Sequence, residues 1–158
     1  MQINEGPVIS VYTDGACSGN PGNGGWSAII NGDKDRVCNV GYNEDTTNNR
    51  MELMGFISGL EMIHADSIVN PKSRYIIYTD SRYIENPINL KWLNKWIANG
   101  FDKIKNVDLW VRISELLFYS NIEIKVVWVP REKNADADQM AKQARDYIYG
   151  KRATLVLE

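Results

Sequence analysis

Cysteine, histidine, long apolar runs and net charge are all scarce in this sequence. Two cysteines and one histidine in 158 residues exclude a disulfide framework, and neither cysteine has a partner at zinc-ligand spacing. No stretch approaches the roughly 20 consecutive apolar residues of a membrane span, and the first residues do not resemble a secretory signal. We therefore expect a cytoplasmic protein that does not bind membranes. The net charge of −2 means that nucleic-acid binding would have to depend on local patches.

The composition is that of a globular protein, with 44% hydrophobic and 24% charged residues. We expect a monomer with one domain over residues 1–158, a core over about 8–149 and a tail, 150–158, that we leave unassigned. Apolar and β-branched runs predict strands at 8–13, 26–30, 36–42, 75–79 and 123–129, with a glycine-rich turn at 19–25. Helices are predicted at 48–64, in two or three pieces within 81–119, and at 134–149. This order predicts an α/β fold, a five-stranded mixed sheet with helices on both faces.

Two strands of the predicted sheet end in the same tripeptide. The first ends Tyr12-Thr13-Asp14 and the fourth ends Tyr78-Thr79-Asp80. If these strands are parallel neighbours, their terminal aspartates lie about one strand spacing, ~4.8 Å, apart. A single aspartate there would merely open a turn, but two adjacent like charges repel unless a cation lies between them.

Glu52 lies on the apolar side of the helix predicted over 48–64. A helical wheel places it beside Phe56 and Ile63, with Gly55 and Gly59 close by. These glycines allow the helix to approach the sheet closely. The helix dipole would account for an acid near the first turn, but not for its inward direction. A carboxylate on such a face is expected to be paired or to bind a metal.

The last predicted helix carries two further acids, Asp136 and Asp138. Its apolar arc leaves them at opposite borders, so the wheel does not choose between them. Either acid could also be a favourable charge in the first helical turn.

A basic and aromatic segment lies between positions 91 and 105, where four lysines and one acid give a local charge of +3. Lys91 and Lys95 form one i,i+4 pair and Trp92 and Trp96 another, so basic and aromatic ridges adjoin on one helix. The other lysines are Lys103 and Lys105. The segment fits either a nucleic-acid contact or an ordinary amphipathic helix with tryptophans inside and lysines in solvent.

Several runs, taken in order, resemble type 1 ribonuclease H. They are Thr13-Asp14-Gly15 before a Gly-Asn-Pro-Gly turn, Thr47-Asn48-Asn49-Arg50-Met51-Glu52-Leu53, Thr79-Asp80-Ser81, Lys105-Asn106-Val107-Asp108-Leu109-Trp110, and Ala137-Asp138 followed by Met140-Ala141. Each run alone is weak, but the ordered set spans about Val8 to Arg145 and is highly specific. The resemblance implies a ribonuclease H-like fold, and it matches the fourth carboxylate of the family to Asp138.

By this resemblance, the protein is an endonuclease that cuts the RNA strand of RNA–DNA hybrids and leaves 5′-phosphate and 3′-hydroxyl ends. Asp14, Glu52, Asp80 and Asp138 would hold two Mg²⁺ ions, with Mn²⁺ as a substitute, because hard cations prefer oxygen ligands. The alternative is a non-catalytic hybrid-binding module with the same fold. Intact carboxylates argue against it.

The resemblance also suggests contacts with the hybrid. Asn20, Asn48 and Asn49 match positions that contact nucleic acid, and Thr47 matches part of a phosphate pocket for the DNA strand. Arg82 stands where many relatives carry glutamine. The segment with Lys91, Trp92 and Lys95 is similar to the basic protrusion that binds the DNA strand.

Residues 130–134 differ from many relatives, whose corresponding loop is longer and carries a histidine. Here the connection is short and has none, as in a histidine-less branch of the family. His64 lies about 12 residues beyond Glu52, hence roughly 18 Å along the helix, too far to reach a bound phosphate. Glu132 is the loop carboxylate that we expect to assist the leaving group.

Overall fold

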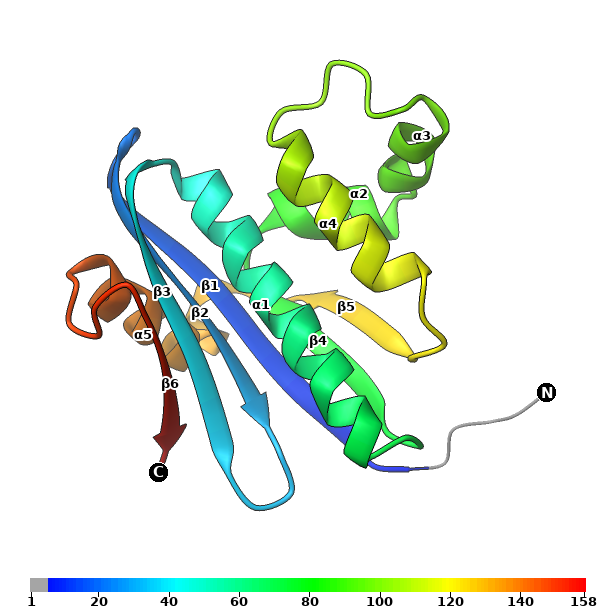
Figure 1. Ribbon diagram of the computed structural model, residues 1–158, viewed down its shortest axis with the longest axis horizontal. Coiled ribbons are helices and arrows are strands. Elements are labelled where there is room, and N and C mark those ends of the chain that lie inside the picture. The colour runs from blue at the N-terminus through cyan, green and yellow to red at the C-terminus, as the bar shows by residue number, and fades with distance from the viewer. Residues whose placement is uncertain (1–5) are drawn as a thin grey trace.

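The computed structural model describes residues 6–158 as a mixed sheet with helices on both faces (Figure 1). Across these residues the strands are β1 (Val8–Gly19), β2 (Gly22–Asn31), β3 (Arg36–Thr46), β4 (Arg74–Thr79), β5 (Ile124–Trp128) and β6 (Arg152–Leu157). The helices are α1 (Asn48–Val69), α2 (Arg82–Asn89), α3 (Trp92–Ala98), α4 (Val107–Phe118) and α5 (Ala135–Arg145), with a short 3₁₀ helix, η1 (Arg131–Lys133), before α5.

The strand order is β5-β4-β1-β2-β3-β6. The chain first forms the predicted antiparallel meander, β1 to β3, and then crosses over through α1 to place β4 parallel to β1. A second crossover through α2, α3 and α4 places β5 parallel to β4. The α/β class and the mixed sheet are therefore confirmed, and the parallel half brings the middle of β1 beside the carboxyl end of β4.

Helix α1 packs along one face of the sheet, where its capping and burial follow from its sequence. The Thr47 side chain accepts a hydrogen bond from the Arg50 amide at 3.3 Å and so caps the first turn. Phe56 and other apolar residues of α1 are fully buried against the strands. At Gly55, a Cβ would lie only 2.6 Å from the Asp14 carbonyl oxygen, so the close approach of helix and strand requires glycine. This approach brings the first turns of α1 to the middle of β1, beside Asp14.

Helix α5 covers the other face, over β1, β2 and β3. A smaller apolar cluster lies beneath it and includes Ile29, Val40 and Met140. The Ser27 hydroxyl donates to the Ala137 carbonyl at 2.6 Å, which ties α5 to the centre of the sheet. The first turn of α5 therefore lies beside β1, across the sheet from α1.

The expectation of five strands is wrong, because the unassigned tail contributes a sixth. Residues 152–157 pair antiparallel with β3, from Arg36 opposite Leu157 to Gly41 opposite Arg152. Their side chains alternate between exposed and half-buried, and Ala153, Leu155 and Leu157 pack against the cluster under α5. Six residues after a helix were too short a pattern to assign without knowledge of β3 as a neighbour.

Three predicted boundaries also differ from the structure. The glycine-rich segment is strand rather than a turn over 19–25, since β1 runs to Gly19 and β2 starts at Gly22. Glycine is required at position 25 because a Cβ there would lie 2.2 Å from the Arg145 amide nitrogen of α5. Helix α1 continues past His64 to Val69, where the run into Pro71 ends it. Helix α5 stops at Arg145, four residues early.

The aromatic core is smaller than the composition suggests. Trp26 and Trp110 are buried, but Trp92 is 42% exposed.

Among the helices of residues 6–158, none combines the length and apolar character needed to cross a membrane.

Candidate active site

Three carboxylates meet just beyond the point where the parallel pairing of β1 with β4 ends. Tyr12 of β1 lies opposite Tyr78 of β4 in the parallel register. Asp14 and Asp80 each follow two residues later and therefore lie side by side. Glu52 reaches the same point from the first turns of α1. The three side chains each offer an oxygen, and these oxygens all lie within 4.8 Å of one another. The neighbouring aspartates and the inward direction of Glu52, both derived from the sequence, meet in this cluster. The first strand does not end at Asp14 as predicted, however, because β1 continues to Gly19.

Asp138 joins the cluster from α5. Together with Asp14, Glu52 and Asp80 it lines a cavity of about 260 Å³, whose other lining residues are Gly15, Asn48 and Arg131. Asp136, the other candidate on this helix, points elsewhere: its exposed carboxylate pairs with Arg36 at 2.8 Å. The structure therefore brings Asp138 to the other carboxylates and leaves Asp136 outside, a choice that the helical wheel could not make.

The donor set suits a hard divalent cation. Glu52 is 7% exposed, and its Oε2 atom has no hydrogen-bond partner. A buried carboxylate oxygen without a partner costs free energy unless a cation satisfies it. The cavity offers four carboxylates and no thiol or imidazole, which is the chemistry that Mg²⁺ and Mn²⁺ prefer. The site could thus hold divalent metal.

Burial and mutual repulsion disfavour ionisation of the three clustered acids. Burial, together with the charges of Asp80 and Asp138, raises the pKa of Asp14 to about 7, against hydrogen bonds from Glu52 and from the Gly15 amide. Burial and the Asp14 charge raise the pKa of Glu52 well above its ordinary value. The pKa of Asp80 is raised as well, chiefly by burial. Without a cation, burial and mutual repulsion therefore favour the protonated forms of Asp14 and Glu52 more than in a free carboxylic acid.

Asp138 differs, because two basic side chains hold it in its charged form. Lys142 lies 3.0 Å and Arg131 3.6 Å from its carboxylate oxygens. Burial raises the pKa of Asp138, but the hydrogen bonds from Lys142 and Asp14 and the two positive charges outweigh it, so the net shift is downward. The cluster thus combines one acid that stays ionised with three that ionise reluctantly.

Asn134 is a buried residue of the site that sequence reasoning missed. Its side-chain amide donates to the Thr13 backbone carbonyl at 2.9 Å. Its backbone carbonyl accepts from the Asp138 backbone amide at 3.0 Å. A hydrogen bond from Asn134 also partly offsets the raised pKa of Asp80. The residue therefore joins the middle of β1 and the end of β4 to the start of α5. The only signal in the sequence was a polar residue immediately before that helix.

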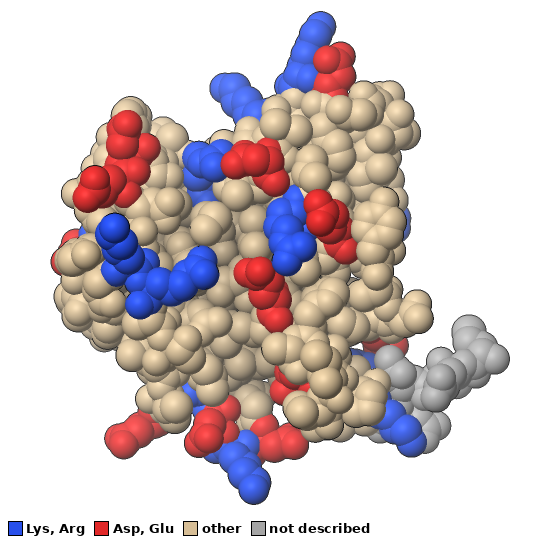
Figure 2. Space-filling model, viewed as in Figure 1, with Lys and Arg blue, Asp and Glu red and all other residues tan. Residues whose placement is uncertain are grey.

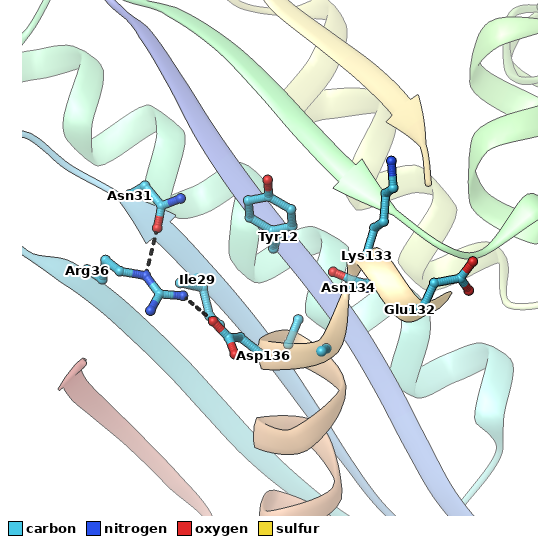
Figure 3. Close-up of a pocket in the computed structure, with 10 residues that line it drawn as sticks. Tyr12, Ile29, Asn31, Arg36, Glu132, Lys133, Asn134 and Asp136 are labelled. Carbon is cyan, nitrogen blue, oxygen red and sulfur yellow. Dashed lines mark hydrogen bonds and ion pairs between the residues drawn. The ribbon is translucent and has the colours of Figure 1, made fainter. Parts of the chain in front are cut away.

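Arg131, rather than Glu132, faces the carboxylates. Glu132 belongs to a separate cavity of about 330 Å³ on the α5 side of the sheet, with Tyr12, Arg36 and Lys133 among its lining residues. In Figure 3 the Glu132 carboxylate points away from Arg36 and Tyr12. Sequence reasoning considered only a carboxylate for this loop and so overlooked the adjacent arginine, although the loop follows the carboxyl end of β5, where ligand sites of open α/β sheets gather.

A second polar cavity adjoins the first through Asn48, which lines both. It measures about 260 Å³, and its lining residues are Asn20, Thr47, Asn48, Asn49, Lys105 and Asn106. The four predicted substrate contacts among them come from the β1–β2 connection (Asn20) and from the cap and first residues of α1 (Thr47, Asn48 and Asn49). The side-chain Oδ1 of Asn20 accepts a hydrogen bond from the Asn48 backbone amide at 3.1 Å, which holds the β1–β2 connection to the start of α1. The structure thus brings all four to one polar surface beside the carboxylates.

Asn106 reaches this cavity from the start of α4 and was not among the predicted contacts. Its backbone is left-handed, with φ of 57°, and its side chain accepts from Arg50 and donates to the Tyr83 hydroxyl. Arg50 in turn makes two hydrogen bonds to Asp108, at 3.1 and 2.8 Å. Only the folded arrangement of α1 and α4 places Asn106 beside Thr47, so spacing along the chain gave no indication of it.

The two ends of the basic segment lie in different places: Lys105 lines the polar cavity beside the carboxylates, whereas Lys91, Trp92 and Lys95 line neither cavity. Figure 2 shows basic side chains projecting over the connection between α3 and α4 at the top of the view. Lys91, Trp92 and Lys95 are exposed at the start of α3, whereas Trp96 packs edge to face on buried Trp110. The helix is therefore partly core and partly an exposed basic and aromatic surface.

Arg82, another predicted contact, is engaged within the protein. Its guanidinium lies over the Trp128 ring, 3.9 Å from the centroid, and pairs with Glu85. The Trp128 indole donates to the Asp80 carbonyl at 3.0 Å. Arg82 thus packs on the aromatic ring that contacts the backbone of a site carboxylate.

Comparisons with known proteins agree with this arrangement. The family model RNase H matches residues 7–146. A ribonuclease H of Bradyrhizobium diazoefficiens is 42% identical over 150 residues, covering 89% of this chain and 91% of that protein, and one of Rhodopseudomonas palustris is 43% identical over 146 residues, covering 86% and 90%. Among solved structures, LC11-RNase H1 in complex with an RNA/DNA hybrid has a TM-score of 0.66 at 26% identity, covering 89% of this chain and 98% of that one. The chain therefore belongs to the ribonuclease H family as a type 1 member and is a ribonuclease H enzyme.

Proposed function

We propose that this protein hydrolyses the RNA strand of RNA–DNA hybrids internally, leaving 5′-phosphate and 3′-hydroxyl ends. The observation that carries the proposal is the convergence of Asp14, Glu52, Asp80 and Asp138 on one cavity from four separate elements. The family supports it, as does the similarity to LC11-RNase H1, which was solved with an RNA/DNA hybrid. A non-catalytic binding module would not need four carboxylates placed where they repel one another.

The four carboxylates would hold two Mg²⁺ ions, or Mn²⁺ as a substitute. Asp14, Glu52, Asp80 and Asp138 would together supply the protein ligands of both ions. When bound, such a pair of ions supplies an activated water and stabilises charge on the leaving 3′-oxygen. The unpartnered Glu52 oxygen and the raised pKa of Asp14 fit this role, because a cation satisfies the first and favours ionisation of the second.

The other residues of the cavity position these groups and the substrate. Lys142 and Arg131 keep Asp138 ionised and oriented. The exposed guanidinium of Arg131 can also contact an anionic phosphate that enters the cavity. Glu132 lines the neighbouring cavity, which leaves it a lesser part than the one expected from the sequence.

The polar cavity beside the carboxylates would receive the hybrid. Asn20, Asn48 and Asn49 offer amide donors and acceptors suited to sugar and phosphate oxygens, and a 2′-hydroxyl distinguishes RNA from DNA at such contacts. Thr47 would contact a phosphate of the DNA strand in the same cavity. Asn48 belongs to both cavities and would contact the hybrid next to the site of cleavage.

The α3 surface would hold the DNA strand at a distance from the chemistry. Its residues Lys91, Trp92 and Lys95 are exposed on one short helix. Contacts of lysines with phosphates raise affinity without selecting a sequence. Arg82 packs on Trp128 but keeps a largely exposed side chain, and it would contact the hybrid from there. We propose that all of these residues belong to a single ribonuclease H domain over residues 1–158, working in the cytoplasm, and that one chain supplies a whole active site.

The decisive experiment incubates the protein with end-labelled RNA–DNA, RNA–RNA and DNA–DNA duplexes, with Mg²⁺ or with EDTA. We expect cleavage of the RNA strand of the hybrid alone, and only with Mg²⁺. Extension of the products by a polymerase tests for the 3′-hydroxyl end. Binding of the hybrid without cleavage in either Mg²⁺ or Mn²⁺ would favour the non-catalytic module instead.

A further inference from the structure

Strand β6 forms an open edge of the sheet with few of the features that protect such edges. It ends the strand order beyond β3 (Figure 1). Its sequence, Arg-Ala-Thr-Leu-Val-Leu, contains no proline, glycine or lysine, and Val156 is 65% exposed. The opposite edge, β5, carries an exposed lysine, Lys125, and is followed by Pro130. Charged residues and proline discourage strand pairing, so β6 is the edge more open to another strand.

The pairing of β6 with β3 determines which of its backbone groups remain free. The Tyr42 amide donates to the Lys151 carbonyl at 2.9 Å, which makes these two residues a hydrogen-bonded pair of the antiparallel ladder. Hydrogen-bonded pairs alternate along such a ladder, so the odd-numbered residues of β6 bond to β3. The even-numbered residues therefore direct their N–H and C=O groups away from the sheet. They are Arg152, Thr154 and Val156 of β6, and the alternation continues to Glu158, the residue that follows the strand.

This row of free groups is complementary to itself. An antiparallel partner centred on Leu155 places Arg152 opposite Glu158 and Thr154 opposite Val156, and the two-fold axis repeats both pairs. All four residues direct their backbone groups outward, so each of these pairs is a hydrogen-bonded one. The opposite charges at the two ends favour this register over one shifted by two residues.

The side chains fit the same arrangement. Leu155 is half-buried on the α5 side, where Ala153 and Leu157 pack against the apolar cluster, so two copies of Leu155 would meet as a close, non-hydrogen-bonded pair. On the other side, Arg152 lies over the Trp26 ring, 5.5 Å from its centroid. By the alternation of the strand, Glu158 projects on this side as well.

We propose that β6 pairs antiparallel with β6 of a second copy of this chain, centred on Leu155, and joins the two sheets into one. The proposal does not rest on the proposed catalytic function, since β6 contributes no residue to the carboxylate cavity. A single strand pair is smaller than the roughly 800 Å² per partner of a typical stable interface. The dimer is therefore weak and forms as the protein concentration rises, in place of the monomer expected from composition.

The first test measures mass against concentration by sedimentation velocity on the full chain. The parent should shift from monomer to dimer as its concentration rises. Arg152→Glu and Glu158→Arg should each weaken the dimer roughly tenfold or more, because each turns two ion pairs into two repulsions. The double reversal should restore it. Lys151→Glu is the control, since it makes the same charge change outside the 152–158 register and should leave the dimer unchanged.

The second test addresses the backbone and the register. Val156→Pro removes an outward N–H without breaking a bond to β3, so it should abolish the dimer while melting close to the control Val156→Thr. Leu155→Cys should form an interchain disulfide on oxidation, whereas Leu157→Cys and the parent, with its native Cys17 and Cys38, should not. A parent that stays monomeric at every concentration, or a dimer that survives both Arg152→Glu and Val156→Pro, would overturn the proposal.

Discussion

Replacing Asp14 with asparagine should abolish cleavage and at the same time stabilise the metal-free protein. The substitution keeps the shape of the side chain but removes the central negative charge of the cluster. In the folded parent protein, the pKa of Asp14 rises from 3.8 to about 7. A raised pKa means that ionised Asp14 is less stable folded than unfolded, so the cost is absent below about pH 4 and complete above about pH 7.

The size of this effect follows from the shift in pKa. The rise in the pKa of Asp14 from 3.8 to about 7 corresponds to about 4 kcal/mol, at roughly 1.4 kcal/mol for each unit of pKa. Asp14 shares its repulsion with Glu52, and asparagine forfeits the charge-assisted bond from the Gly15 amide. We therefore expect a gain of about 2–4 kcal/mol in the free energy of unfolding at pH 8. For a chain of this length that raises Tm by roughly 5–15 °C.

Thermal melts at pH 4 and pH 8, with EDTA and with Mg²⁺, measure this effect. The gain of Asp14→Asn over the parent should appear at pH 8 in EDTA, fade toward pH 4, and shrink in Mg²⁺, which stabilises only the parent. Asp136→Asn is the matched control, because that exposed acid loses only a surface pair with Arg36. It should cleave normally and melt near the parent. Near-normal cleavage by Asp14→Asn, or an unchanged Tm at pH 8 in EDTA, would refute the reasoning.

Three further predictions concern residues around the cluster. Alanine at the lysines of the basic segment should weaken hybrid binding with little change in kcat. In filter-binding titrations, the slope of log binding constant against log salt concentration should fall by roughly 0.7–0.9 per lost phosphate contact. An unchanged slope would mark these lysines as merely solvent-exposed. These lysines are Lys91, Lys95, Lys103 and Lys105. Arg131→Ala should lower kcat roughly 10- to 100-fold in steady-state cleavage assays, because the cavity loses its exposed cation, whereas Glu132→Gln should stay close to the parent; the reverse ranking would return the auxiliary role to Glu132. His64→Ala should keep full activity and lose about 1 kcal/mol of stability in urea titrations, because among the described residues the His64 ring makes a hydrogen bond with the Leu116 carbonyl alone, at 2.8 Å. A large fall in kcat would contradict this.

The central elements of the fold and the cluster were predictable because their signals are local. The repeated Tyr-Thr-Asp ending predicted neighbouring aspartates if the two strands were parallel neighbours, and the register of Tyr12 with Tyr78 shows that they are. The wheel position of Glu52 followed from helical periodicity alone, and burial against the sheet is its consequence. Strand β6 lacked such a signal, because six alternating residues become a strand only when β3 offers them a partner.

The residues that support the cluster could not be found in the same way, because their roles arise between elements distant in sequence. Asn134 matters through its bond to Thr13, 121 positions earlier, and Asn106 through Arg50, 56 positions away. Neither spacing corresponds to a helical or strand period, so no local pattern marks these contacts. A carboxylate that binds metal must lie on an inward face and so leaves a periodic trace, whereas an amide that joins two loops leaves none. The choice between Asp136 and Asp138 falls between these cases, because both lie at the border of the apolar arc and only the docking of α5 on β1 and β2 decides which one enters the cavity.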